Sequence, residues 1–140
     1  MRRIYYRFPQ RVDLSFTLGL PFPEALKHII TELNGAEKTK TTGKELVQVR
    51  TKVEVASDRT TFGDAPPDIF RPGMVTEAVD LRISVLALAL RGGGKVPIAN
   101  DVFFVRLTDR SRNTDVEIAK EGSSPGVDAL DLKNLILGKS

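Results

Sequence analysis

The fold class is decided by the stretch AVDLRISVLALAL, residues 78–90. In its first half, apolar residues alternate with polar ones from Val79 to Ser84, and a period of two residues is typical of a half-buried β-strand. From Val85 onward the residues of both faces are apolar. That change indicates a strand in the middle of the molecule, or one covered on both sides.

Further strands and two helices are predicted around this segment. Alternating or apolar strand-like stretches cover residues 11–18, 46–56, 95–98, 102–107 and 116–119. Pro97 favours an edge position for the third of these, and Asn100-Asp101 predicts a turn after it. A helix with one apolar stripe is predicted over residues 23–33, ended by Asn34-Gly35. A short helix is predicted from Ser124-Pro125 to Gly138. Because successive strands lack helical crossovers, we predict one α+β domain, residues 1–140, with both helices packed on an antiparallel sheet.

Three connecting segments carry distinct signals. The triple glycine at residues 92–94 predicts a hairpin turn that needs positive φ angles. Residues 36–44 are polar and predict a mobile loop. Residues 57–77 contain three prolines and two glycines and predict a long irregular loop. Loops of that length are uncommon inside a compact domain and are often functional.

The composition excludes several kinds of active site. The chain has 140 residues, no cysteine and one histidine, His28. Disulfides, thiolate zinc sites and cysteine nucleophiles are therefore absent, and His28 has no histidine partner for a metal. Neither Gly43-Lys44 nor Gly94-Lys95 is followed by serine or threonine, as a phosphate-binding loop requires.

These absences predict a binding or structural protein, not an enzyme, with no catalytic residue, no resident metal and no cofactor. The longest apolar run, residues 85–90, is too short to span a bilayer. One enzymatic alternative stays open, because the long loop carries three aspartates. They are Asp58, Asp64 and Asp68.

The charge of +3 is unevenly distributed and suggests an anionic partner. The N-terminal segment interleaves arginine with aromatic residues and contains no acid before Arg11, while residues 36–44 supply lysines. Arginine can hold phosphates and rings can stack on unpaired bases, so nucleic acid and an anionic membrane are both candidates. The alternative is that the rings pack against the sheet. The candidate binding residues are Arg2, Arg3, Tyr5, Tyr6, Arg7, Arg11, Lys38, Lys40 and Lys44.

Two stretches resemble the matrix proteins of rhabdoviruses. The first runs from the strand Val12–Leu18 through Pro21-Phe22 into the helix at residues 23–33. The second is the proline-rich group at residues 66–72, followed by the strand that begins at Ala78. In that family, an alternating strand, a bend and a helix open the folded domain, and a Phe-Arg-Pro-like group leads into a strand.

The resemblance implies a viral structural protein of the virion and of the host cytoplasm or inner membrane face. Such a protein self-associates, coats the nucleocapsid and contacts the inner membrane leaflet. The segment that we expect to self-associate comprises Pro67, Ile69, Phe70, Arg71 and Pro72. Two alternatives stay open: a cytoplasmic single-stranded nucleic-acid-binding protein, and another capsid or tail component of a virus or phage.

Overall fold

The computed structural model describes residues 8–42, 44–56, 62–64, 78–122 and 126–138. The chain forms a six-stranded antiparallel sheet with the strand order β1-β6-β5-β4-β3-β2. The strands are β1 (Leu14–Leu18), β2 (Ala36–Thr42), β3 (Glu45–Val55), β4 (Ala78–Arg91), β5 (Gly94–Asp109) and β6 (Thr114–Lys120). The helices are α1 (Phe22–Leu33) and α2 (Ala129–Ile136).

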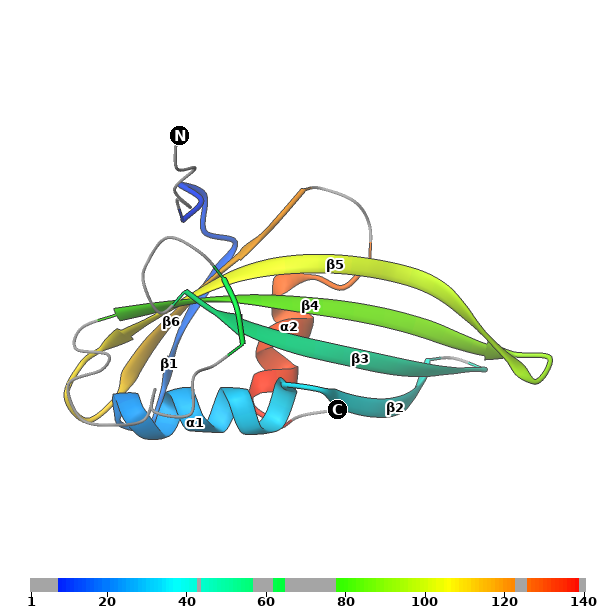
Figure 1. Cartoon of the computed structure of the whole chain (residues 1–140), viewed down its shortest axis with the longest axis horizontal. Coiled ribbons are helices and arrows are strands. Elements are labelled where there is room, and N and C mark those ends of the chain that lie inside the picture. Colours follow the sequence, from blue (N-terminus) through cyan, green and yellow to red (C-terminus); the bar gives the residue numbers. More distant parts are fainter. Residues whose placement is uncertain (1–7, 43, 57–61, 65–77, 123–125, 139–140) are drawn as a thin grey trace.

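Both helices lie on the same side of the curved sheet (Figure 1). Alternate residues of the central strands point toward them, and Leu81, Ile83 and Phe103 are fully buried. The helices contribute apolar side chains to the same core, among them Ile29 from α1 and Leu132 from α2. The α+β class and the antiparallel sheet are thus confirmed, and the strand predicted at residues 78–90 is the central strand β4.

The segment predicted as a mobile loop, residues 36–44, is instead mostly the edge strand β2. It pairs with β3 from Ala36 opposite Thr51 to Thr42 opposite Glu45. The prediction was wrong because an edge strand needs a partner on one side only and carries polar residues on its exposed positions. β2 therefore lacks the apolar alternation by which a half-buried strand is recognised.

Strand β5 is longer than the sequence indicates. Two strands, residues 95–98 and 102–107, were predicted with a turn at Asn100-Asp101, but β5 runs unbroken from Gly94 to Asp109. Pro97 is tolerated because it lies where the pairing register with β4 shifts, and an irregular position can lack a ladder donor. Asp101 lies within β5, is buried and is paired with Lys120 of β6, so it forms no turn.

The turn between β4 and β5 has the predicted conformation. Gly92 and Gly93 have φ angles of 54° and 78°, as a tight two-residue hairpin turn requires. This turn lies at the far end of two long strands and projects beyond both helices (Figure 1). The sheet therefore has one end packed against helices and one end that extends away from them.

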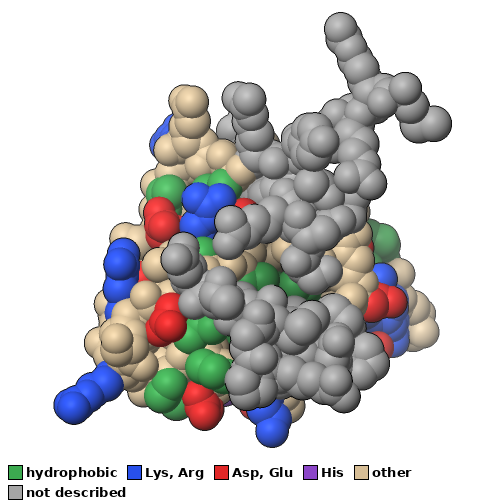
Figure 2. All heavy atoms as spheres, turned by 60° about the vertical axis from the view of Figure 1, so that its left-hand side comes forward, with side chains coloured by type: hydrophobic (Ala, Val, Ile, Leu, Met, Phe, Trp, Pro, Cys, Tyr) green, Lys and Arg blue, Asp and Glu red, His purple; other side chains and the backbone are tan. Residues whose placement is uncertain are grey.

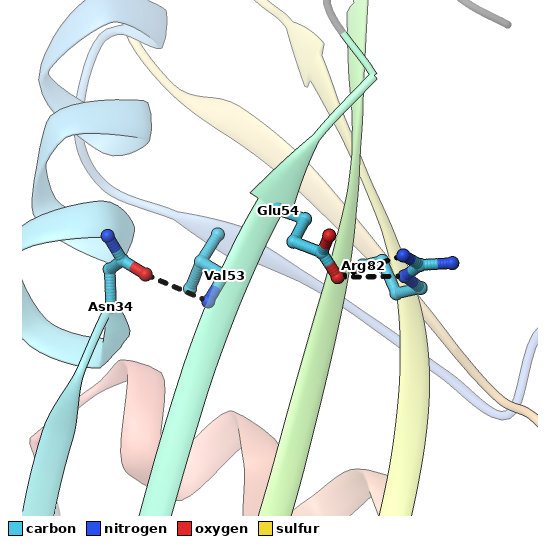
Figure 3. Close-up of polar contacts among 4 residues, drawn as sticks. All are labelled: Asn34, Val53, Glu54 and Arg82. Carbon is cyan, nitrogen blue, oxygen red and sulfur yellow. Dashed lines mark hydrogen bonds and ion pairs between the residues drawn. The ribbon is translucent and has the colours of Figure 1, made fainter. Parts of the chain in front are cut away.

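Helix α1 ends as predicted and is tied to β3 at that end. Gly35 has a φ of 73°, and the buried hydroxyl of Thr51 donates a 2.7 Å hydrogen bond to the carbonyl of Leu33. The side-chain oxygen of Asn34 accepts a 3.2 Å bond from the amide of Val53 (Figure 3). The first bond satisfies a carbonyl that the end of a helix leaves unpaired, and the second ties the C-cap residue Asn34 to β3.

Helix α2 begins later than predicted. Its N-cap is Asp128, not Ser124, and Asp128 and Asp131 exchange hydrogen bonds of 2.8 and 3.0 Å as a capping box. Ser124 before Pro125 is a sequence typical of a helix N-cap. A capping box of Asp128 and Asp131 satisfies two backbone amides, however, and the helix begins there. The two helices are linked where the Nε2 of His28 contacts the carbonyl of Ile136 at 2.7 Å.

Candidate interaction surfaces

The sheet face opposite the helices carries charged side chains that are paired with one another. Arg82 donates two hydrogen bonds to Glu54, of 2.9 and 3.1 Å (Figure 3). Arg106 likewise donates bonds of 2.7 and 3.0 Å to Asp80. Because each guanidinium already has a carboxylate, this part of the face has little net charge to offer an anionic ligand.

Aromatic rings lie on the same two arginines. The guanidinium of Arg82 is 5.1 Å from the ring centre of Phe62, and that of Arg106 is 4.4 Å from the ring centre of Phe8. Phe8 therefore packs against the sheet, which is the alternative considered for the aromatic N-terminal segment. Figure 2 shows acidic, basic and apolar side chains interspersed among the described residues at the end of the molecule opposite the β4–β5 turn.

A buried ion pair lies between β5 and β6. The carboxylate of Asp101, 3% exposed, is 3.2 Å from the ammonium nitrogen of Lys120 and accepts a 3.0 Å bond from the amide of Val127. A Cβ at Gly126 would come within 2.5 Å of the same carboxylate, so only glycine permits this approach. The contacts of Asp101 with Lys120 and with the amide of Val127 hold the residues before α2 against the sheet. We therefore assign this cluster a structural role.

Two hollows adjoin β1, with volumes of about 460 and about 480 Å³. The first is lined by Arg11, Asp13, Leu14, Lys120, Gly122, Asp128, Ala129 and Leu130. The second is lined by Ser15, Phe16, Thr17, Arg110, Asp115, Val116 and Glu117. Neither lining includes a histidine, and in the second the carboxylate of Asp115 is held at 2.7 Å by Arg110. No nucleophile in either lining is therefore paired with a histidine base.

The projecting end of the sheet exposes apolar side chains on both faces. Every residue from Arg91 to Ile98 is exposed, including Val96 at 41% and Ile98 at 46%. Leu46, at the start of the neighbouring strand β3, is 42% exposed. We name Leu46, Val96 and Ile98 the apolar tip. A hairpin end of this kind offers apolar area that no described part of the chain covers.

Cations surround the apolar tip. Lys44 and Lys95 are exposed and form no ion pair with any other described residue. Arg91 donates a 2.6 Å hydrogen bond to Glu45, which raises the pKa of Arg91 further above its ordinary value. The tip thus combines exposed apolar side chains with exposed cations.

The predicted binding residues do not form one surface. Arg11 is exposed beside Asp13 next to β1, whereas Lys38, Lys40 and Lys44 lie in or after β2, at the other edge of the sheet. Lys38 is 3.9 Å from Glu32. The ten other residues of the two predicted sets lie outside the described residues. They are Arg2, Arg3, Tyr5, Tyr6, Arg7, Pro67, Ile69, Phe70, Arg71 and Pro72.

The apolar tip is the surface that the sequence interpretation missed. Val96 and Ile98 were predicted on a short edge strand, which is wrong, because they belong to the long strand β5, which lies between β4 and β6 in the sheet. Their position beside the triple-glycine turn was nevertheless a usable signal. Residues next to a hairpin turn lie at the end of a sheet, where a core is out of reach. Among the described residues no three potential metal ligands cluster, and none of the described helices is long and apolar enough to cross a membrane.

Comparison of the chain with protein-family models, curated proteins and solved structures finds no match.

Proposed function

We propose that the protein is a matrix-like structural component of a virion that self-associates and contacts an anionic membrane surface. The observation that carries the membrane contact is the apolar tip together with its cations. Moving exposed aliphatic side chains from water into the boundary between lipid headgroups and acyl chains lowers the free energy of the system. Neighbouring cations are attracted to anionic lipids. One end of the sheet supplies both contributions: the apolar one comes from the apolar tip and the electrostatic one from Lys44 and Lys95.

The chemistry of this end favours lipid over single-stranded nucleic acid as the partner. Binding of unpaired bases relies on aromatic platforms. The segment from Arg91 to Ile98 and the residues from Lys44 to Leu46 contain no aromatic side chain. Aliphatic residues beside lysines instead match a membrane interface, and a hairpin that projects beyond the helices can reach a flat surface without obstruction by them.

Vesicle co-sedimentation tests the apolar contribution. The protein is mixed with vesicles of phosphatidylcholine alone or of phosphatidylcholine with phosphatidylserine. We expect Val96→Asp/Ile98→Asp to weaken binding to the anionic vesicles about tenfold or more, because two apolar side chains no longer enter the interface. The matched control is Val12→Asp/Leu130→Asp, which changes two exposed apolar residues elsewhere and is expected to bind as the wild type does.

The cationic contribution has its own variant. Lys44→Gln/Lys95→Gln removes two charges that are each worth about 1 kcal/mol near an anionic surface, so we expect about thirtyfold weaker binding at low salt. Wild-type protein that binds neutral and anionic vesicles equally, or neither, would refute the proposed membrane contact. Tighter, salt-sensitive binding to single-stranded RNA than to vesicles would favour the nucleic-acid-binding alternative instead.

A further inference from the structure

The two edges of the sheet are suited to each other. Among the described residues, β1 has β6 as its one strand partner and β2 has β3, so each presents one side without a strand neighbour. Because the sheet has six antiparallel strands, an even number, its two edge strands run in opposite directions. A second copy in the same orientation would therefore place its β1 antiparallel to β2 of the first, with all helices on one side of the joined sheet.

The charges near the two edges are opposite. Residues 36–55, which comprise β2, the turn and β3, contain five lysines and arginines and three glutamates, a net charge of +2. The other edge, residues 11–18 and 109–121, which comprise β1, β6 and the turn before β6, contains five acidic residues and four lysines and arginines, a net charge of −1. The lysine among them, Lys120, is itself paired with Asp101 in the interior.

The side chains of the two edge strands also match on the face opposite the helices. β2 presents the exposed Thr39 and Thr41 there, and β1 presents the exposed Ser15 and Thr17 at the same spacing. Hydroxyl residues opposite one another on neighbouring strands form favourable pairs. Pairing Thr17 with Thr39 also brings Lys40 opposite Phe16 in the antiparallel register.

We propose that the occupant of each free edge is a second copy of this chain, with β2 of one copy pairing with β1 of the next. This inference rests on the proposed self-association and specifies its surface. Pairing of like edges is disfavoured, because two β2 edges would bring net positive segments together and two β1 edges net negative ones. A head-to-tail contact of this kind extends into a ring or a helical filament rather than stopping at a dimer.

Cysteine cross-linking tests the contact directly, since the chain has no cysteine of its own. Purified Thr17→Cys and Thr39→Cys are oxidised separately and as a mixture. We expect cross-linked dimers in the mixture and little product from either variant alone, because residues opposite one another on paired strands are close enough for a disulfide. The control replaces Thr17→Cys by Asn113→Cys, an exposed turn position that is not on β1.

Charge exchange gives a second test that does not depend on the register. Lys40→Glu/Lys44→Glu reverses the charge near β2, and Glu117→Lys/Glu121→Lys reverses it near β1. We expect each variant alone to self-associate about tenfold more weakly than the wild type in sedimentation velocity without lipid or nucleic acid. Mixed in equal amounts, the two variants again present opposite charges at every contact, so assembly is restored.

The outcomes separate this inference from the proposed function. A wild-type protein that stays monomeric at every concentration would overturn both the self-association and the strand pairing. If the wild type assembles, but the mixture of Thr17→Cys with Thr39→Cys cross-links no more than the control with Asn113→Cys, the strand pairing alone is overturned. Homodimers from either single-cysteine variant would likewise overturn the head-to-tail arrangement.

Discussion

One buried hydroxyl decides how helix α1 meets the sheet. Thr51 is 6% exposed and its hydroxyl donates to the carbonyl of Leu33. Thr51→Val keeps the shape but leaves that buried carbonyl without its donor, so we expect the free energy of unfolding to fall by about 1–2 kcal/mol. Urea denaturation measures the loss. Thr39→Val, an exposed position on β2, is the control, and an equal loss there would contradict the assigned role.

The buried pair of Asp101 and Lys120 makes a second prediction at the same scale. Lys120→Met leaves the Asp101 carboxylate buried without its cation, and we expect a loss of about 3 kcal/mol in the free energy of unfolding. Asp101→Leu/Lys120→Met removes both charges and is expected to recover much of it. Thermal or urea unfolding measures all three proteins. Equal stability of Lys120→Met and wild type would show that the pair contributes little.

A surface ion pair that responds to pH links Arg110, in the turn after β5, to Asp115 of β6. The hydrogen bond from Arg110 to Asp115 lowers the pKa of this carboxyl below its ordinary 3.8, assisted by attraction to the same guanidinium and a bond from Thr17. A carboxyl whose pKa is lower in the folded chain stabilises the fold above its unfolded pKa, and this contribution disappears as pH falls through the folded value.

Asp115→Asn isolates this contribution. We expect the wild type to be slightly more stable than Asp115→Asn near neutral pH, and the difference to shrink between about pH 5 and about pH 2. Midpoints of urea unfolding at several pH values measure the difference. Because both partners are exposed to solvent, the effect is small and should weaken with added salt. A difference that stays constant across this pH range would contradict the assignment.

Among the secondary-structure elements, the strands predicted best from the sequence are those with one face buried in the core. β4 was predicted because Val79, Leu81 and Ile83 alternate with polar residues, and burial enforces that alternation. β2 was not, since an edge strand is held by backbone bonds to β3 and its side chains need no apolar pattern. Within β5, Asp101 resembled a turn residue, and its compensating partner Lys120 lies in another strand that local sequence cannot reveal.

The residues that stabilise the fold and the residues of the proposed membrane contact lie in different parts of the molecule. The core lies under the helices, whereas the apolar tip lies beyond them (Figure 1). Two positions on the same strand, β5, test this division: Ile98 is 46% exposed and Phe103 is fully buried. We expect Ile98→Ser to change the free energy of unfolding by less than about 0.5 kcal/mol and Phe103→Ala to lower it by about 3–5 kcal/mol. Similar losses would mean that the tip belongs to the cooperative core.

The candidate surfaces were less predictable than the fold. Composition predicted a cationic chain without a catalytic site, and Lys44 was predicted as a binding residue at the end of a polar segment; both stay predictions. The proximity of Lys44 to Val96 and Ile98 depends on β2, β3, β4 and β5 lying side by side, which is a property of the sheet order. The opposite net charges of the segments around β1 and β2 likewise have meaning only once these strands are known to be the two edges.

The pairing of β1 with β6 also bears on the order of folding. Leu14 pairs with Ile118, whereas Arg91 pairs with Gly94 across a tight turn. Contacts between residues close in sequence form with little loss of chain entropy, and distant ones form late. During synthesis β1 must therefore wait, unpaired, until β6 has left the ribosome, and in that interval its free backbone is available to other nascent chains.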